Sequence, residues 1–198
     1  LGNADKDTIE CSLSTPRLYF GKGGNYWLAA NRLMNWQGAA SEDSYRYLDI
    51  NSSNFKIDSV NAQDTVAILK DCYFIPTKNV VKGSDTNKKI QLRKQLKTLI
   101  KEYGGIMWSY NHDNSYMNDV MNGTERESTS YYSGTHLSGT NHAIAVVGWD
   151  DNYSRENFPK DCRPENDGAW LIRNSWGTSI CKDGYMYMSY EEPTLGCS

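Results

Sequence analysis

A histidine and an asparagine stand at the ends of two apolar segments, and they constrain this chain more than any other feature. Residues 141–149 read Asn-His-Ala-Ile-Ala-Val-Val-Gly-Trp, and residues 174–177 read Asn-Ser-Trp-Gly. His142 opens the first apolar segment, and Asn174 follows a second one at 168–173. Because short apolar runs of this composition are typical of buried strands, both polar side chains are predicted to lie at strand ends.

An imidazole and a buried carboxamide are two of the three groups of a Cys-His-Asn triad. In such a triad the imidazole takes the thiol proton, and the amide fixes the orientation and tautomer of the ring. Trp176, two residues after Asn174, would keep water away from their hydrogen bond. Taken alone, His142 could be a structural histidine. Taken alone, Asn174 could be a turn asparagine beside a core tryptophan. The ordered pair favours the catalytic interpretation.

The composition excludes several classes of protein. A chain of 198 residues with 38% hydrophobic content can bury the core of one compact domain or two small lobes. Its net charge of -3 comes from interspersed acids and bases, so neither a nucleic-acid partner nor a basic membrane face is predicted. No apolar run approaches the roughly 20 residues that span a bilayer, so no membrane span is predicted.

The cysteines and acidic residues do not indicate a metal site. The five cysteines are too scattered for a disulfide scaffold or for the close pairs of a zinc site: Cys11, Cys72, Cys162, Cys181 and Cys197. Their odd number leaves at least one unpaired, and buried reduced thiols are an equally good interpretation. The acidic segment 150–167 lacks the order of a calcium loop and is interpreted as a solvated insertion. We therefore expect no metal and no cofactor.

Helical spacing of apolar residues predicts two helices, and a mainly β second half follows them. The first helix covers 25–36 with Asn25 as its N-cap, and the second covers 87–103 with Gly104 at its end. A buried strand is predicted at 65–75, followed by a linker at 77–86. Further strands are predicted at 106–110, 142–149, 168–173 and 184–190, with polar loops at 128–141 and 150–167. His112 and His136 are interpreted as surface residues.

With these motifs the chain resembles the papain family of cysteine proteases, and more closely its bacterial secreted branch. The similarity runs in order along most of the sequence. It includes residues 23–27 with two glycines, 36–47, 96–110 with a Tyr-Gly-Gly turn, His142-Ala143 and Asn174-Ser175-Trp176-Gly177. The last two are the most specific. The family often has a second Trp-Gly shortly afterwards, where this chain has Ile180 and Cys181.

The resemblance implies an α+β, papain-like fold with two lobes. An incomplete helical lobe would cover 1–77, and an antiparallel β lobe carrying the histidine and asparagine would cover 78–198. His142 would be the general base and acid, Asn174 would orient it, and Trp176 would cover their bond. For substrate binding, Gly23 and Gly24 would hold the peptide backbone. The residues lining the pocket for the second side chain on the acyl side would be Asn25, Tyr26 and Ala143.

The implied activity is that of a thiol endopeptidase, whose nucleophile the sequence does not supply. Cys11 precedes His142 by 131 residues (142 minus 11), within the roughly 130–150 expected between a catalytic cysteine and its partners. Its downstream residues, ending at Pro16, make a poor helix start, so it is not predicted to attack. We therefore expect this chain alone to be inactive, as a piece of the enzyme that is either truncated or separated from an N-terminal chain carrying the catalytic cysteine. The expected substrate is a protein or peptide.

Two other functions remain open on sequence alone. A catalytically inactive papain-like module would use the same groove to bind peptides or surface polymers, although binding alone does not require His142 and Asn174. An acyl-transfer enzyme such as a transglutaminase has a Cys-His dyad but would not explain residues 174–177. The bacterial relatives imply a secreted or cell-surface location.

Overall fold

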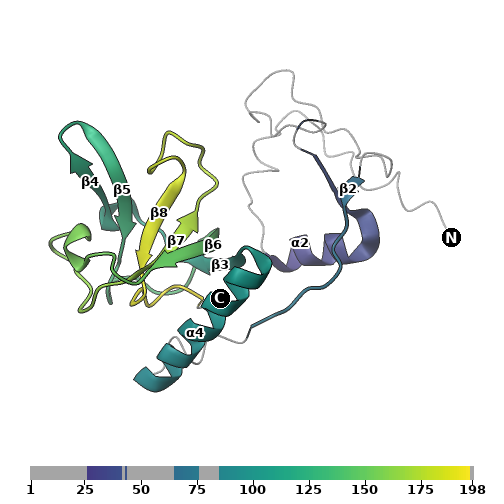
Figure 1. The fold of residues 1–198 in the computed structure, drawn as a ribbon, viewed down its shortest axis with the longest axis horizontal. Helices are drawn as coiled ribbons and strands as arrows, with labels where there is room; N and C mark the ends of the chain where they lie inside the picture. Colours follow the sequence, from purple (N-terminus) through teal and green to yellow (C-terminus); the bar gives the residue numbers. More distant parts are fainter. Residues whose placement is uncertain (1–25, 42, 44–64, 76–84, 197–198) are drawn as a thin grey trace. The chain divides into compact units, whose positions relative to one another are not determined.

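The chain divides into two units, Leu1–Phe74 and Ile75–Ser198. The structure is a computed structural model that describes residues 26–41, 43, 65–75 and 85–196 (Figure 1). The first unit contains α2 (Tyr26–Arg32), the π-helix η1 (Leu33–Gln37), β1 (Ala39–Ala40) and β2 (Thr65–Ala67), which pairs antiparallel with β1. The predicted assignment of 1–77 and 78–198 to a helical and a β-rich lobe stays a prediction.

The first predicted helix forms, but it changes type along its length. The α-helical part ends at Arg32, and five π-helical residues follow. Gly38 ends the element at a φ of +61°. A Cβ there would lie 2.2 Å from Cγ2 of Thr65, so only glycine fits this turn. The proposed N-cap, Asn25, lies outside the described residues.

The buried strand predicted at 65–75 is wrong in both length and burial. Only the three residues of β2 are extended in a ladder, because the two-residue β1 offers no longer partner. Val66 is 68% exposed and Tyr73 is 67% exposed. Phe74 instead stacks on Trp27 within the same unit, at 4.1 Å between ring centroids. The apolar composition of this segment therefore does not reflect a core strand.

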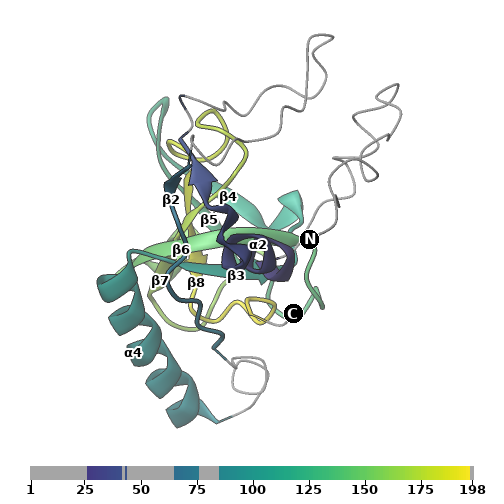
Figure 2. The ribbon, with the colours of Figure 1, turned by 90° about the vertical axis from the view of Figure 1, so that its right-hand side faces the viewer.

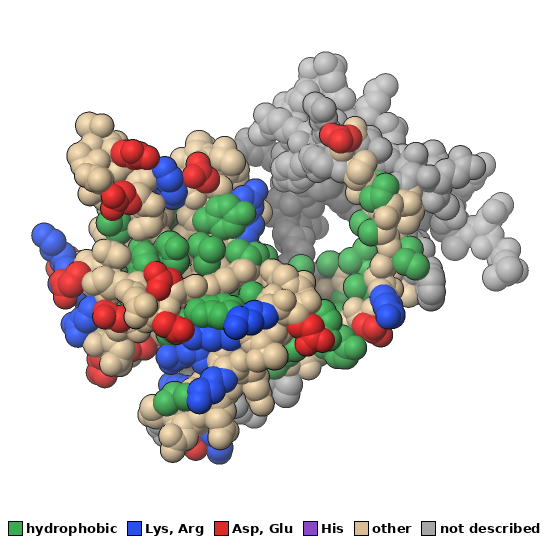
Figure 3. Space-filling view, viewed as in Figure 1, with side chains coloured by type: hydrophobic (Ala, Val, Ile, Leu, Met, Phe, Trp, Pro, Cys, Tyr) green, Lys and Arg blue, Asp and Glu red, His purple; other side chains and the backbone are tan. Residues whose placement is uncertain are grey.

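The second predicted helix is confirmed as α4 (Thr86–Tyr103). Asp85 caps its start by accepting a hydrogen bond from the Lys88 backbone N–H at 3.1 Å. Gly104 ends it in the left-handed conformation, with its N–H bonded to the Ile100 carbonyl. One face buries Leu92, Leu96 and Ile100, while basic side chains gather on the outside (Figure 3). None of the described helices is long and apolar enough to cross a membrane.

The second unit contains α4 and a six-stranded sheet with the order β3-β6-β7-β8-β5-β4. Figure 2 shows these elements in a second view. Its strands are β3 (Ile106–Tyr110), β4 (Met117–Asn122), β5 (Glu125–Tyr131), β6 (His142–Asp150), β7 (Ala169–Arg173) and β8 (Tyr185–Ser189). The four strands predicted in the second half of the chain are confirmed as β3, β6, β7 and β8. The pairings are antiparallel, as expected for the β lobe, except that β5 pairs in parallel with β8, so the sheet is mixed.

Strands β4 and β5 were not predicted, and part of the expected loop at 128–141 lies in β5. These strands are polar, and hydrogen bonds satisfy the buried hydroxyl groups of β5. Thr129 donates to Oδ1 of Asp119 at 2.7 Å, and Ser130 donates to the Asn157 carbonyl at 2.6 Å. Both donors are fully buried. A buried hydroxyl with a partner carries little penalty, so a strand forms here without apolar alternation.

The core lies between α4 and the sheet. Trp108 of β3 and Trp170 of β7 meet edge to face, with ring centroids 6.3 Å apart. The segment after β8 returns to this core, where Gly196 donates its N–H to the Ser109 carbonyl at 2.8 Å. Glu192 anchors that segment by accepting bonds from the N–H and hydroxyl of Ser133 at 2.7 and 2.8 Å. Burial raises the pKa of this carboxyl.

Gly168 is a backbone position where a side chain should be costly. Its φ is +105°, and a Cβ there would lie 2.6 and 2.7 Å from two ring atoms of Tyr190. We expect Gly168→Ala to lower the free energy of unfolding by about 2–4 kcal/mol, from left-handed strain plus overpacking. Gly139→Ala is the matched control, since its φ is +74° with nothing near its Cβ, and should cost about 1 kcal/mol. Equal urea midpoints for the two variants would contradict this prediction.

Candidate active site

The register between β6 and β7 brings the predicted histidine and asparagine together. The ladder ends at Ala145, which pairs with Arg173. Asn174 is the next residue after β7, and His142 opens β6, so both lie at the same end of two neighbouring strands. Because strand side chains alternate between faces, a one-residue slip in register would turn His142 to the opposite face. The sheet therefore fixes this pair.

The two side chains form a hydrogen bond of 2.9 Å between His142 Nε2 and Asn174 Oδ1. The Ser175 backbone N–H also donates to this asparagine atom, at 2.8 Å, which requires it to be the carbonyl oxygen. An oxygen of this kind accepts only. Nε2 of His142 must therefore carry the proton, and Nδ1, which has no hydrogen-bond partner among the described residues, presents its lone pair. This tautomer can accept a proton.

Trp176 covers the hydrogen-bonded pair. Its indole stacks on the His142 ring with centroids 4.5 Å apart and planes 23° from parallel. Asn174 is only 6% exposed. In such surroundings its bond to His142 is stronger than it would be in water. The Nδ2 group of Asn174 is buried without a hydrogen-bond partner among the described residues, although an unsatisfied buried donor costs about 1–3 kcal/mol.

The guanidinium group of Arg126 holds the loop after Trp176. Arg126 donates to the carbonyls of Ser179 and Cys181 at 3.3 and 2.9 Å and pairs with Asp119 at 2.9 Å. Cys181 is 4% exposed and belongs to the core, whereas Ile180 is 44% exposed. At the position where the family often has a second Trp-Gly, a buried thiol therefore packs in the core.

A third aromatic residue, His112, lies in this site, whereas its polar sequence neighbours predict a surface position. Its ring lies 4.5 Å from Trp176 and 6.0 Å from His142, centroid to centroid. Asn141 ties its backbone to the start of β6 by accepting from the His112 N–H at 2.7 Å and donating to the His112 carbonyl at 3.0 Å. The sequence signal available was Asn141 itself, next to His142, but its partner lies 29 residues away.

Hydrogen bonds fix both nitrogens of His112. Nδ1 bonds the Tyr110 hydroxyl at 2.8 Å, and Nε2 bonds Asn114 Oδ1 at 2.9 Å. Burial lowers the pKa of the His112 imidazole and outweighs the opposing bond to Asn114. His112 is thus a neutral ring close to His142.

The remaining predicted site residues fall in different parts of the chain. Ala143 follows His142 on β6, is exposed and pairs with Ser109. Tyr26 opens α2 in the first unit and contacts the Trp27 ring at 5.6 Å. The substrate-binding candidates Gly23, Gly24 and Asn25 lie outside the described residues, so the substrate-binding set stays a prediction.

The described cysteines of the second unit lack the properties of a nucleophile. Cys162 and Cys181 are free thiols, and burial raises the pKa of each. A reactive thiol needs a lowered pKa, because the thiolate is the attacking species. Cys72, in the first unit, is exposed, while Cys11 and Cys197 lie outside the described residues. Within the described part of the chain, no group of three or more His, Cys, Asp or Glu residues is arranged to hold a metal ion.

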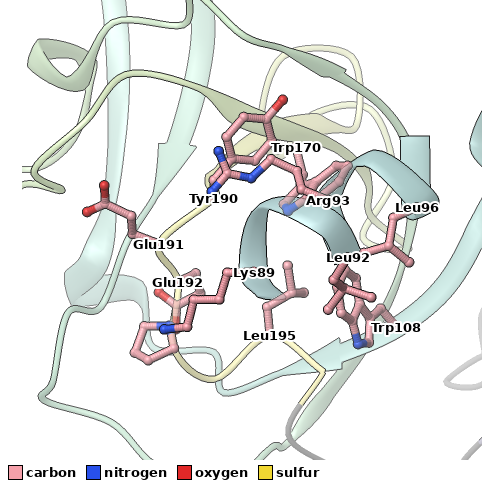
Figure 4. A pocket seen from close by; sticks show the side chains of 11 residues that line it. Lys89, Leu92, Arg93, Leu96, Trp108, Trp170, Tyr190, Glu191, Glu192 and Leu195 are labelled. Atoms are coloured by element: carbon pink, nitrogen blue, oxygen red, sulfur yellow. The ribbon is translucent and has the colours of Figure 1, made fainter. Parts of the chain in front are cut away.

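A separate cavity of about 290 Å³ lies between α4, β3, β7 and the segment after β8 (Figure 4). Its floor is apolar and aromatic, and its rim is charged, with the Arg93 guanidinium 4.3 Å from the centre of the Tyr190 ring. Neither His142 nor Asn174 lines it. The lining residues are Lys89, Leu92, Arg93, Leu96, Trp108, Trp170, Tyr190, Glu191, Glu192, Pro193 and Leu195.

Comparison with known proteins gives the family. The sequence profile described as papain family cysteine protease matches residues 4–197. The chain belongs to this family, and its fold is the α+β papain-like fold. A search of curated proteins found no match.

Two solved structures of one bacterial protease are similar to the chain. The clostridial cysteine protease Cwp84 after propeptide cleavage is 27% identical, with a TM-score of 0.62, over 89% of this chain and 39% of that one. The cysteine protease and lectin-like domains of Cwp84, a surface layer associated protein of Clostridium difficile, are 29% identical, with a TM-score of 0.56, over 88% and 34%. The chain thus spans less than two fifths of either structure's length.

The lowered pKa of His112 predicts a pH-dependent stability. The unfolded chain takes up the proton at its ordinary pKa, whereas the folded chain resists protonation until lower pH. Stability is therefore expected to fall as the pH drops from the ordinary histidine value toward the folded one. Urea unfolding at several pH values should show a steeper acid loss in the wild type than in His112→Asn. Identical pH dependences would contradict a buried neutral His112.

Proposed function

We propose that the chain carries the acid–base half of a papain-like thiol endopeptidase. The single observation that supports this most is the His142–Asn174 bond, whose geometry leaves Nδ1 of His142 free to take a proton. In the proposed reaction a cysteine thiolate attacks the peptide carbonyl while His142 holds the thiol proton. His142 then gives that proton to the leaving amine, and water hydrolyses the acyl-enzyme with His142 as base. Trp176 shields the pair throughout.

The nucleophile in this proposal comes from polypeptide other than the described part of the second unit. Cys162 and Cys181 have raised pKa values, the reverse of an attacking thiol. The buried Nδ2 of Asn174, without a partner among the described residues, further supports an additional segment that supplies an acceptor. The substrate would be a protein or peptide held by Gly23 and Gly24, with Asn25, Tyr26 and Ala143 at the adjoining pocket.

The proposed location is outside the cell or at its surface. The similar protein Cwp84 is described as surface layer associated, and the family and fold agree with a bacterial protease of that kind. The alternative of an inactive module that binds peptides or surface polymers is tested by the same experiment, because only the protease needs a reactive thiol and a base.

Replacing either residue of the pair should strongly slow cleavage by the protein that contains the nucleophile. His142→Ala removes the base and is expected to lower kcat/KM by about 10²–10⁴-fold. Asn174→Ala removes one hydrogen bond to a ring that becomes charged and is expected to cost about 10- to 100-fold. His136→Ala, on an exposed histidine that stacks on Tyr116, is the control. Peptide cleavage measured with a fluorogenic substrate checks each value.

A thiol-directed epoxide identifies the nucleophile in the same protein. We expect one labelled cysteine, loss of cleavage on labelling, and unchanged labelling in Cys162→Ala and Cys181→Ala. A label on Cys162 or Cys181, or full cleavage by His142→Ala, would refute the proposal. Peptide binding without either labelling or cleavage would establish the inactive module instead.

A further inference from the structure

His112 contacts Trp176, which in turn stacks on His142. The reaction proposed above does not use His112. The Trp176 indole stacks on His142 at 23° and meets the ring of His112 edge-on at 65°, with both centroids 4.5 Å away. We propose that His112 is a positioning residue of this site, whose neutral imidazole holds Trp176 against His142. Its effect on catalysis rests on the proposed function, whereas its effect on packing does not.

Local contacts make His112 rigid enough for this role. Burial raises the pKa of the Tyr110 hydroxyl, so that hydroxyl stays protonated and donates to Nδ1 of His112 at 2.8 Å. Nε2 then carries the proton and donates to Asn114 Oδ1 at 2.9 Å. The backbone is held by the two bonds to Asn141. Ring, tautomer and main chain are all fixed without help from Trp176.

Trp176, in contrast, lies in a loop and needs such support. Its side chain is half-buried, it follows β7 after a bend, and the next residue, Gly177, has a φ of +82°. The two histidine rings are its described aromatic contacts. Removing the ring of His112 would leave one edge of the indole open, and the indole could then move away from His142. Water would reach the His142–Asn174 bond.

The charges around His112 agree with a neutral ring. Four titratable groups face it: Tyr110, Tyr131, His142 and Asp113. The Tyr131 ring stacks on it at 5.7 Å and 30°. Asp113 is the carboxylate of this group, and it accepts a bond from the Ser115 N–H at 2.9 Å. The charge of Asp113 and the bond to Asn114 favour protonation of His112, but burial is the larger effect and keeps its pKa below the ordinary value.

Ring nitrogen NMR tests the packing without reference to peptide cleavage. The protein is labelled with ¹⁵N-histidine, and water exchange of the His142 Nε2 proton is measured. His112→Ala is expected to speed this exchange about tenfold, because the bond is no longer covered. His112→Asn, which also lacks the ring, provides the same test if the alanine variant does not fold. His112→Phe keeps a ring against Trp176 and should exchange like the wild type, as should the control His136→Ala.

Kinetics then separate positioning from simple stability. Rates are divided by the concentration of sites that a thiol-directed epoxide titrates, so misfolded protein does not count. His112→Ala should lower kcat about tenfold with KM within about twofold, and His112→Phe should restore kcat. Wild-type exchange in the ringless variants, or exchange in His112→Phe as fast as in His112→Ala, would overturn the inference. If the protein cleaves no peptide, the proposed function fails and the NMR comparison still decides this inference.

Discussion

The antiparallel register of β6 against β7 is the constraint on which the candidate site depends. Ala145 pairs with Arg173, so the start of one strand and the end of the next place His142 and Asn174 side by side. A loop could bring the same residues together, but it would hold them less firmly, since sites built on strands are positioned by many ladder bonds. The buried faces of both strands resist a slip, because Ile144, Val146 and Ile172 would all leave the core.

Local signals predicted the elements whose causes are local. The stripe of apolar residues and the Gly104 cap predicted α4, and short apolar runs predicted β3, β6, β7 and β8. Strands β4 and β5 could not be predicted, because they bury hydroxyl groups instead of alternating apolar side chains. The hydroxyl of Ser130, for example, donates to the carbonyl of Asn157, 27 residues away. At 65–75 the error is the reverse, because a buried strand was predicted and most of the segment is exposed and not in a strand. Its composition is that of a core strand, but burial depends on a partner, and β1 pairs with only its first few residues.

The residues of the candidate site also differ in how far the sequence predicts them. His142 and Asn174 could be paired from sequence, because each ends an apolar run and the chemistry of an imidazole with an amide suggested the contact. His112 could not, because a histidine among polar turn residues looks solvated until its contacts with Asn141 and Trp176 are known. Trp176 was predicted as a cover for the hydrogen bond, and the structure adds that a second imidazole meets the same indole in an edge contact.

Electrostatics explains why that second ring should be neutral. In the proposed reaction His142 becomes positively charged, and the His112 centroid lies 6.0 Å from it. A second cation at that separation would oppose the charge by roughly 1–3 kcal/mol at effective dielectric constants between those of water and a protein surface. Burial lowers the pKa of His112 and favours its uncharged form, so it can pack against Trp176 without this penalty. A lysine or arginine there could contact the indole, but its charge would destabilise the protonated His142.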